Sequence, residues 1–161
     1  MTKDLQLRDH LLNVLRGGSA HISFEEFIAE FPLNLINREI EGVPYTAWQV
    51  LEHMRIAQWD ILEFSRNATH VSPTFPEGYW PTAGVAANDE MWNSTVQSFQ
   101  TDLRSLENLV EDPATDLFSE IPHGNGQTIL REVLLVADHN AYHIGELGIL
   151  RQVLQAWPDQ R

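Results

Sequence analysis

The sequence predicts an all-α protein folded as a four-helix bundle. Apolar residues recur at helical spacing in four long segments, and each of the last three begins after a residue typical of helix N-caps. No segment shows the strict alternation of apolar and polar residues that is typical of a strand. The chain has 161 residues and no internal repeat, so we expect a single domain over residues 1–161. Four long helices of this kind are typical of a bundle.

The first helix is predicted over residues 4–16, and the glycine pair that begins at Gly17 ends it. A short helix is expected next, with Ser23 as its N-cap. Glu26 lies three residues later and completes a capping box, in which each side chain binds the other residue's backbone N–H. Pro32 is expected to end this short helix.

The second long helix is predicted over residues 46–66, with Thr46 as its cap, after an irregular stretch over 33–45. Its predicted buried stripe consists of Val50, Met54, Ala57, Ile61 and Phe64. Residues 67–86 hold three prolines and two glycines, so a long loop is expected there.

The third helix is predicted over residues 89–110, and Asn88 is its cap. Its apolar residues alternate four and three apart, as in the seam of a bundle: Trp92, Val96, Phe99, Leu103, Leu106 and Val110. After a loop over 111–127, Thr128 is expected to cap a fourth helix that runs to about Trp157. Because two of the connecting loops are long, the helices need not alternate simply in direction.

Composition excludes several classes of protein. The formal net charge is −13 and Lys3 is the single lysine, so the surface repels phosphate and we expect no nucleic-acid partner. The chain has no cysteine, which excludes disulfides, thiolate metal ligands and a cysteine nucleophile. No apolar stretch is long enough to cross a membrane and the N-terminus does not resemble a signal peptide, so a cytoplasmic protein is expected.

Three of the seven histidines form a candidate metal site. His139 and His143 are four residues apart on the predicted fourth helix, so both side chains project to the same side. His53 borders the apolar stripe of the second long helix. Three neutral imidazoles that face the interior leave one coordination position open, as in catalytic zinc sites. The alternative is that these histidines simply pack in the core.

Two carboxylates lie near the candidate site. Asp60 follows His53 by two helical turns along the same edge, which makes it the candidate catalytic base or a support for an imidazole N–H. Glu146, three residues after His143, is a candidate for the same roles. An ordinary salt bridge or a solvated surface is the alternative for both residues. The HExxH pattern of metalloproteases is absent.

Two loops supply candidate substrate-pocket residues. Tyr79 and Trp80 lie in the Pro- and Gly-rich stretch 75–81, where they are expected to form an apolar wall over a pocket. His123 lies in the loop before the fourth helix and is a candidate for contacting a substrate. For Tyr79 and Trp80 the alternative is a rigid crossover loop that covers the end of the core. For His123 the alternative is an ordinary surface histidine.

With these residues the chain resembles the DinB/YfiT-like superfamily, in which metal-dependent enzymes are found. The resemblance is carried by residues 47–60, 76–81, 123–128 and 137–147, and most strongly by the second-helix histidine combined with HxxxH on the last helix. It implies a four-helix bundle, frequently dimeric, with one divalent metal ion bound by three histidines. Carried over by position, these ligands are His53, His139 and His143.

The resemblance also implies reaction classes, because characterised relatives include thiol-dependent S-transferases, a thiol-dependent isomerase and hydrolases. We therefore expect an enzyme in which zinc, nickel or iron activates a low-molecular-weight thiol or water against a small-molecule substrate. A homodimer is expected as well. One alternative is a non-enzymatic metal-binding or stress-response bundle, and another is an interaction module whose histidines only pack.

Overall fold

The computed structural model describes residues 2–158, so residues 1 and 159–161 of the expected domain lie outside its description. Within this range the fold is all-α, as predicted, with two isolated β-bridges and no strand. None of the described helices combines the length and the apolar character needed to span a bilayer. The elements are α1 (Lys3–Arg16), α2 (Phe24–Ile28), η1 (Leu33–Leu35), α3 (Ala47–Arg66), η2 (Glu77–Tyr79), α4 (Asp89–Glu111) and α5 (Ile129–Val153).

The helices begin where the capping residues place them. Thr46, Asn88 and Thr128 each accept a hydrogen bond from the backbone N–H three residues later, at the starts of α3, α4 and α5. The predicted capping box of Ser23 and Glu26 is present at the start of α2. These side chains satisfy backbone donors that have no partner within the helix, which is why the starts are predictable.

Two helices end earlier than predicted. α2 ends at Ile28, before Pro32, and α5 ends at Val153 rather than near Trp157. After α5 the chain folds back on itself: Gln155 has a φ of 53°, and the Ala156 N–H donates to the Arg151 carbonyl. The guanidinium of Arg151 in turn donates to the Ala156 carbonyl at 3.0 Å, which fixes this turn.

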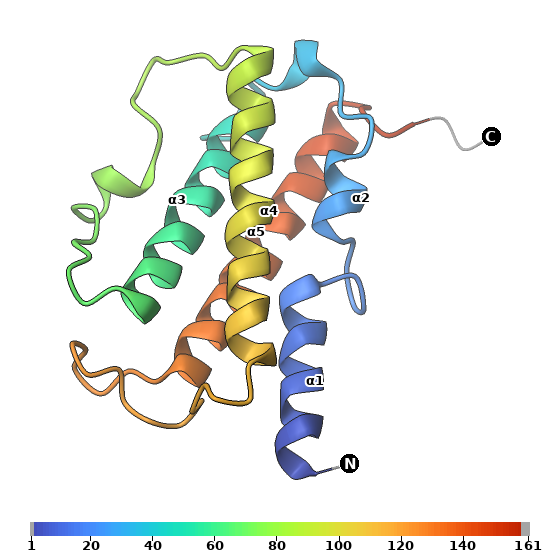
Figure 1. The fold of residues 1–161 in the computed structure, drawn as a ribbon. Coiled ribbons are helices and arrows are strands. Elements are labelled where there is room, and N and C mark those ends of the chain that lie inside the picture. Colours follow the sequence, from blue (N-terminus) through green and yellow to red (C-terminus); the bar gives the residue numbers. More distant parts are fainter. Residues whose placement is uncertain (1, 159–161) are drawn as a thin grey trace.

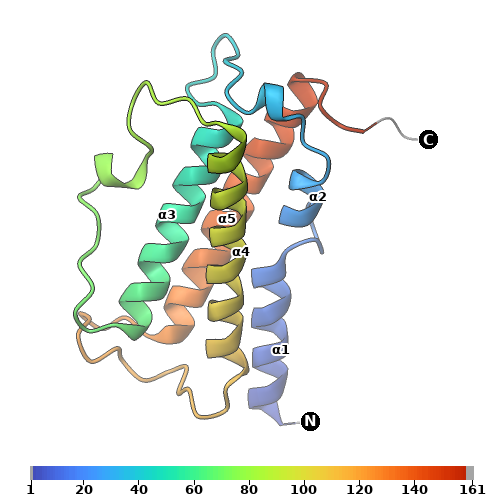
Figure 2. The ribbon, with the colours of Figure 1, turned by 45° about the horizontal axis from the view of Figure 1, so that its top comes forward.

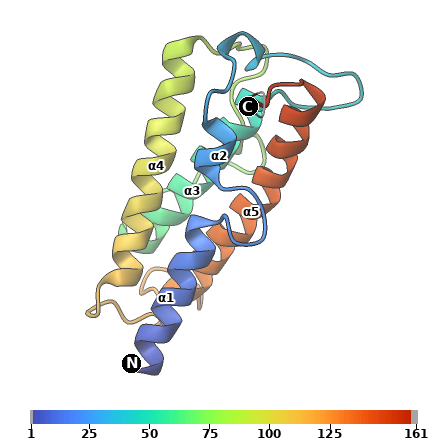
Figure 3. The same cartoon turned by 90° about the vertical axis from the view of Figure 1, so that its right-hand side faces the viewer.

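The four long helices are not arranged in simple up-and-down order. α3 and α4 run in the same direction, opposite to α1 and α5 (Figures 1 and 2). The loop between α3 and α4 therefore returns along the length of the bundle. α3 packs against α4 and α5, and α1 packs against the same two helices. Figure 3 shows α1 beside α5. α3 and α5 thus form one face of the bundle.

The core is mostly apolar, and a chain of hydrogen bonds between buried amides crosses it. Gln58 of α3 is fully buried, and its Nε2 donates to the Phe99 carbonyl of α4 at 2.7 Å. Its Oε1 accepts a hydrogen bond from Asn140 Nδ2 of α5 at 2.9 Å. Because a buried amide is costly unless paired, this chain fixes the register of three helices next to His139.

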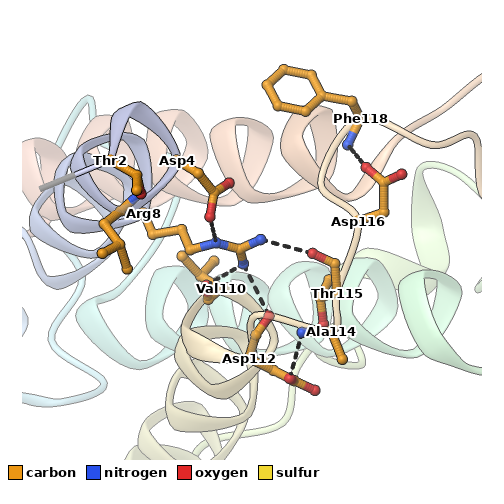
Figure 4. A network of polar contacts seen from close by, with 10 residues as sticks. Thr2, Asp4, Arg8, Val110, Asp112, Ala114, Thr115, Asp116 and Phe118 are labelled. Carbon is orange, nitrogen blue, oxygen red and sulfur yellow. Dashed lines mark hydrogen bonds and ion pairs between the residues drawn. The ribbon is translucent and has the colours of Figure 1, made fainter.

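A buried arginine ties α1 to the end of α4. Arg8 donates from Nη1 to the carbonyls of Val110 and Asp112, at 2.7 and 3.0 Å, and from Nη2 to that of Thr115 at 2.9 Å (Figure 4). Its Nε pairs with Asp4 at 2.9 Å. The guanidinium thus binds a carbonyl of the last turn of α4, that of its C-cap and one of the loop that follows.

Candidate metal centre

The three predicted histidines meet on the face formed by α3 and α5. His53 comes from α3, and His139 and His143 come from successive turns of α5. One nitrogen of each ring lies within 4.8 Å of the others. His53 Nε2 is 3.2 Å from both His139 Nε2 and His143 Nε2. His143 is buried and the other two are half-buried, so the cluster lies just beneath the surface.

Hydrogen bonds hold the far side of two of the rings. His53 Nδ1 lies 2.7 Å from the Tyr79 carbonyl, and His143 Nδ1 lies 2.7 Å from the Glu146 carboxylate. Both oxygens accept hydrogen bonds, so each Nδ1 carries the proton and each Nε2 presents a lone pair. The imidazoles of metal sites are typically held in this way.

Burial favours the uncharged form of two of the three rings. Burial lowers the pKa of His53, and the neighbouring His143 lowers it further. Burial, followed by the proximity of the other two imidazoles, lowers the pKa of His139 to about 4. Near neutral pH these two rings therefore carry no additional proton that would bridge the facing nitrogens.

The donor set fits a metal ion. His53 Nε2 and His143 Nε2 face each other at 3.2 Å, and because their Nδ1 atoms face oxygen acceptors, both Nε2 atoms are available to bind a cation. Two nitrogens bound to one zinc ion at about 2.0–2.1 Å in tetrahedral geometry lie about 3.3 Å apart. The observed separation of 3.2 Å is close to this value. Among the described residues the cluster contains three ligand groups, which leaves a coordination position for a further molecule.

Trp80 and Tyr79 lie against this centre, although in different roles. The Trp80 ring stacks on His53, with 4.1 Å between centroids and 5° between planes, and also stacks on Tyr45 at 3.9 Å. Trp80 therefore covers one face of His53, and its expected role as the wall of a substrate pocket stays a prediction. Tyr79 contacts His53 through its backbone carbonyl and directs its hydroxyl toward Asp60.

Asp60 lies outside the three-histidine cluster. It is buried, and both of its oxygens are occupied: Oδ1 by His70 Nε2 at 2.7 Å and Oδ2 by the Tyr79 hydroxyl at 2.6 Å. The expected proximity of Asp60 to the site is thus indirect, through Tyr79. Its action as a catalytic base stays a prediction.

His123 is placed away from the cluster. Its Nε2 lies 2.6 Å from the Phe64 carbonyl, and its ring meets the Phe64 ring edge-on. Phe64 follows His53 by eleven residues, which corresponds to about 16 Å along a helix. The structure gives His123 an anchoring contact at the end of α3, and its contact with a substrate stays a prediction.

Sequence reasoning missed a cavity and two residues. A cavity of about 230 Å³ lies between α3, the start of α5 and the loop that joins α3 to α4, which we call the crossover loop. It is one to two helical turns away from the histidines. It is lined by Asp60, Ile61, Phe64, Ser72, Gln127, Arg131, Glu132 and Leu135. His70 and Tyr45 were missed because both lie in irregular segments, where spacing along the chain does not indicate which side chains meet.

Comparison with known families places this geometry in context. The family model described as the DinB superfamily matches residues 19–147, which is more than half of the chain and includes all three histidines. No curated protein and no solved structure matched the chain.

Proposed function

Since the chain belongs to the DinB superfamily, we propose that it binds one divalent metal ion through His53, His139 and His143 and acts as a metal-dependent enzyme. The observation that carries the proposal is the cluster of three imidazoles, in which His53 Nε2 lies 3.2 Å from the Nε2 atoms of both His139 and His143. Zinc and nickel suit three imidazoles best, and iron is the next candidate.

The proposed reaction transfers a thiol to an electrophile or hydrolyses a small molecule. When bound, the ion would supply a Lewis acid that lowers the pKa of a thiol or of water. Because the chain has no cysteine, the nucleophilic sulfur would come from a low-molecular-weight cosubstrate. The Tyr79 carbonyl and Glu146 hold the imidazoles, Trp80 covers one face of His53, and the adjacent cavity offers room for a substrate.

The alternative is a bundle in which the metal serves only structure or sensing. Structural zinc sites are typically closed by four protein ligands, whereas the described cluster offers three. This difference favours the enzyme. A metal site with no exchangeable position would favour the alternative.

Elemental analysis of protein purified without a His tag tests the proposal. We expect about one equivalent of metal in the parent and none in His53→Ala or His139→Ala. His10→Ala removes an exposed histidine of α1 and serves as the matched control, which should keep the metal. A parent protein that neither contains nor takes up zinc, nickel or iron would overturn the proposal.

Turnover separates the enzyme from the structural alternative. Thiol cosubstrates are screened against electrophiles, and the metal-free parent is compared with the reloaded parent. We expect activity to depend on the metal and to disappear in His139→Ala. Turnover by a metal-free His139→Ala protein would rule out this mechanism.

A further inference from the structure

A continuous chain of hydrogen bonds leads from the interior of the crossover loop to the candidate metal centre. His70 Nε2 contacts Asp60 Oδ1 at 2.7 Å, and the Tyr79 hydroxyl donates to Asp60 Oδ2 at 2.6 Å. The carbonyl of the same tyrosine accepts the proton of His53 Nδ1 at 2.7 Å. Tyr79 therefore connects Asp60 to His53, because its side chain binds Asp60 and its backbone carbonyl binds His53.

The Asp60 end of this chain is shielded from solvent. The side chains of Asp60 and His70 are 9% and 7% exposed. Burial, together with the hydrogen bond to Asp60, raises the pKa of Tyr79 to about 12, so the hydroxyl keeps the proton that it donates. A hydrogen bond from a neutral hydroxyl to a buried carboxylate is short and strong, and here it holds the tyrosine in one place.

The Tyr79 carbonyl belongs to a short turn that the hydroxyl of the same residue anchors to α3. Tyr79 is the last residue of the three-residue turn η2, in a crossover loop of irregular structure. Its carbonyl is free to accept from His53 because η2 ends there. The Asp60 carboxylate accepts a hydrogen bond from the hydroxyl at the other end of the same residue.

We propose that Asp60 and Tyr79 act together as positioning residues for His53. Asp60 holds the Tyr79 hydroxyl, the Tyr79 carbonyl then holds the proton on His53 Nδ1, and His53 Nε2 is left to bind the metal. This inference rests on the metal binding proposed above. It gives Asp60 a role other than that of a base, since both of its oxygens are already occupied.

Zinc affinity of four variants, measured by competition with a chromophoric chelator, tests the proposal. Tyr79→Phe removes only the hydroxyl, and we expect zinc affinity to fall about tenfold or more. Asp60→Ala should weaken zinc binding to a similar extent. Because the two residues act in series, the double variant should bind zinc with the same affinity as the single variant that binds it less tightly. Asp60→Asn keeps an oxygen that accepts from the hydroxyl and should restore most of the affinity.

Tyr45→Phe is the matched control, because it removes a tyrosine hydroxyl next to the site and keeps the ring that stacks on Trp80. Its zinc affinity should equal that of the parent. The proposal would be overturned if Asp60→Ala lowered zinc affinity while Tyr79→Phe left it unchanged. It would also be overturned if the losses of zinc binding free energy in the two single variants added up in the double variant. An unchanged affinity in both single variants, which a purely catalytic Asp60 predicts, would overturn it too.

A second measurement needs no metal. In nitrogen-15 NMR of the metal-free protein, His53 should carry its proton on Nδ1 in the parent and in Tyr45→Phe, and show a mixture of both tautomers in Tyr79→Phe. If the parent bound no zinc, the proposed function would fail, while this spectrum would still decide whether Tyr79 positions His53. An Nδ1-protonated His53 in Tyr79→Phe would overturn the inference.

Discussion

At the scale of single residues, the acceptors behind His53 and His143 differ in charge. His53 is held by a neutral carbonyl, whereas His143 is held by the Glu146 carboxylate, whose side chain is 40% exposed. A charged acceptor makes the imidazole a stronger donor to a metal. The two contacts therefore contribute to metal binding in ways that separate substitutions distinguish.

We predict that Glu146→Ala lowers zinc affinity by about tenfold, because His143 loses the acceptor that keeps its proton on Nδ1. Glu146→Gln keeps an acceptor without the charge and should lower affinity less. Chelator competition measures both. Asp138→Asn, on the exposed side of the same helix, is the control and should change nothing. Equal affinity in the parent and in Glu146→Ala would contradict the prediction.

The shifted pKa of His139 predicts how stability depends on pH. In the unfolded chain His139 takes up a proton near pH 6.5, whereas in the folded protein it does so only near pH 4. The unfolded state therefore binds more protons between these values, and stability falls as the pH falls through this window. The protonation of His139 alone should lower the free energy of unfolding of the metal-free protein by about 2 kcal/mol between pH 7 and pH 5.

Urea unfolding at pH 7 and pH 5 measures this loss. His139→Gln cannot take up the proton, so its stability should fall less between the two pH values. His10→Gln, on the exposed side of α1, should behave like the parent. An identical pH dependence in His139→Gln and the parent would show that burial of this imidazole is not what destabilises the protein in acid.

Which residues form the site was predictable from sequence only in part. The four-residue spacing of His139 and His143 fixes their common direction on a helix, and the position of His53 on its own helix places it at the edge of the core. The link between Asp60 and Tyr79 was not predictable, because it depends on the path of an irregular loop. Spacing along a chain carries information only where the backbone repeats.

At the scale of elements, helix starts were predicted more accurately than helix ends. Starts depend on one side chain that bonds three residues ahead, as Thr46 does for Gln49 N. The end of α5 depends on contacts from elsewhere, since Arg151 donates to the carbonyls of Glu26, Phe27 and Ala29 around α2 as well as to Ala156. Such long-range contacts leave no local pattern.

The cap of α3 gives a stability prediction. Thr46→Ala should lower the free energy of unfolding by about 1 kcal/mol, because the backbone N–H of Gln49 loses its acceptor. Thr46→Ser keeps the hydroxyl and should cost only a few tenths of that. Urea unfolding measures both variants. Zinc binding by folded Thr46→Ala should stay unchanged, since the cap lies two turns before His53; a stability equal to that of the parent would contradict the prediction.

At the scale of the whole molecule, the bundle was predictable but the relative directions of its helices were not. The parallel arrangement of α3 and α4 requires a connection as long as the bundle, and the length of residues 67–86 allowed this without requiring it (Figure 2). Arg8 joins α1 to the last turn of α4 and the loop after it, although these segments lie about a hundred residues apart in the chain.

We predict that Arg8→Met destabilises the protein on the order of 3 kcal/mol, because three carbonyls and Asp4 lose a buried charged donor. Arg16→Met is the matched control on the same helix. Its side chain is 51% exposed, so loss of its ion pairs with Glu107 and Glu111 should cost less than about 1 kcal/mol. Thermal and urea unfolding measure both; similar losses would contradict the prediction.

The homodimer stays a prediction at this scale. Tyr142, Ile149 and Val153 lie on one side of α5 and are 56–67% exposed, an apolar row that a second copy would cover. Light scattering at micromolar concentration should give twice the monomer mass for the parent and the monomer mass for Ile149→Glu. Leu5→Glu, at an exposed position of α1, is the control and should stay dimeric. A monomeric parent would contradict the prediction.

His53 and His139 are 86 residues apart in the chain, and α5 is the last of the described helices in chain order. A polypeptide emerging from the ribosome therefore cannot assemble the three imidazoles until α5 has been synthesised and has docked beside α3. A truncated or misfolded chain would keep at most one or two of these nitrogens in place. An ion that needs all three would bind only finished molecules and stabilise them by mass action, so its occupancy would report how many chains had completed folding.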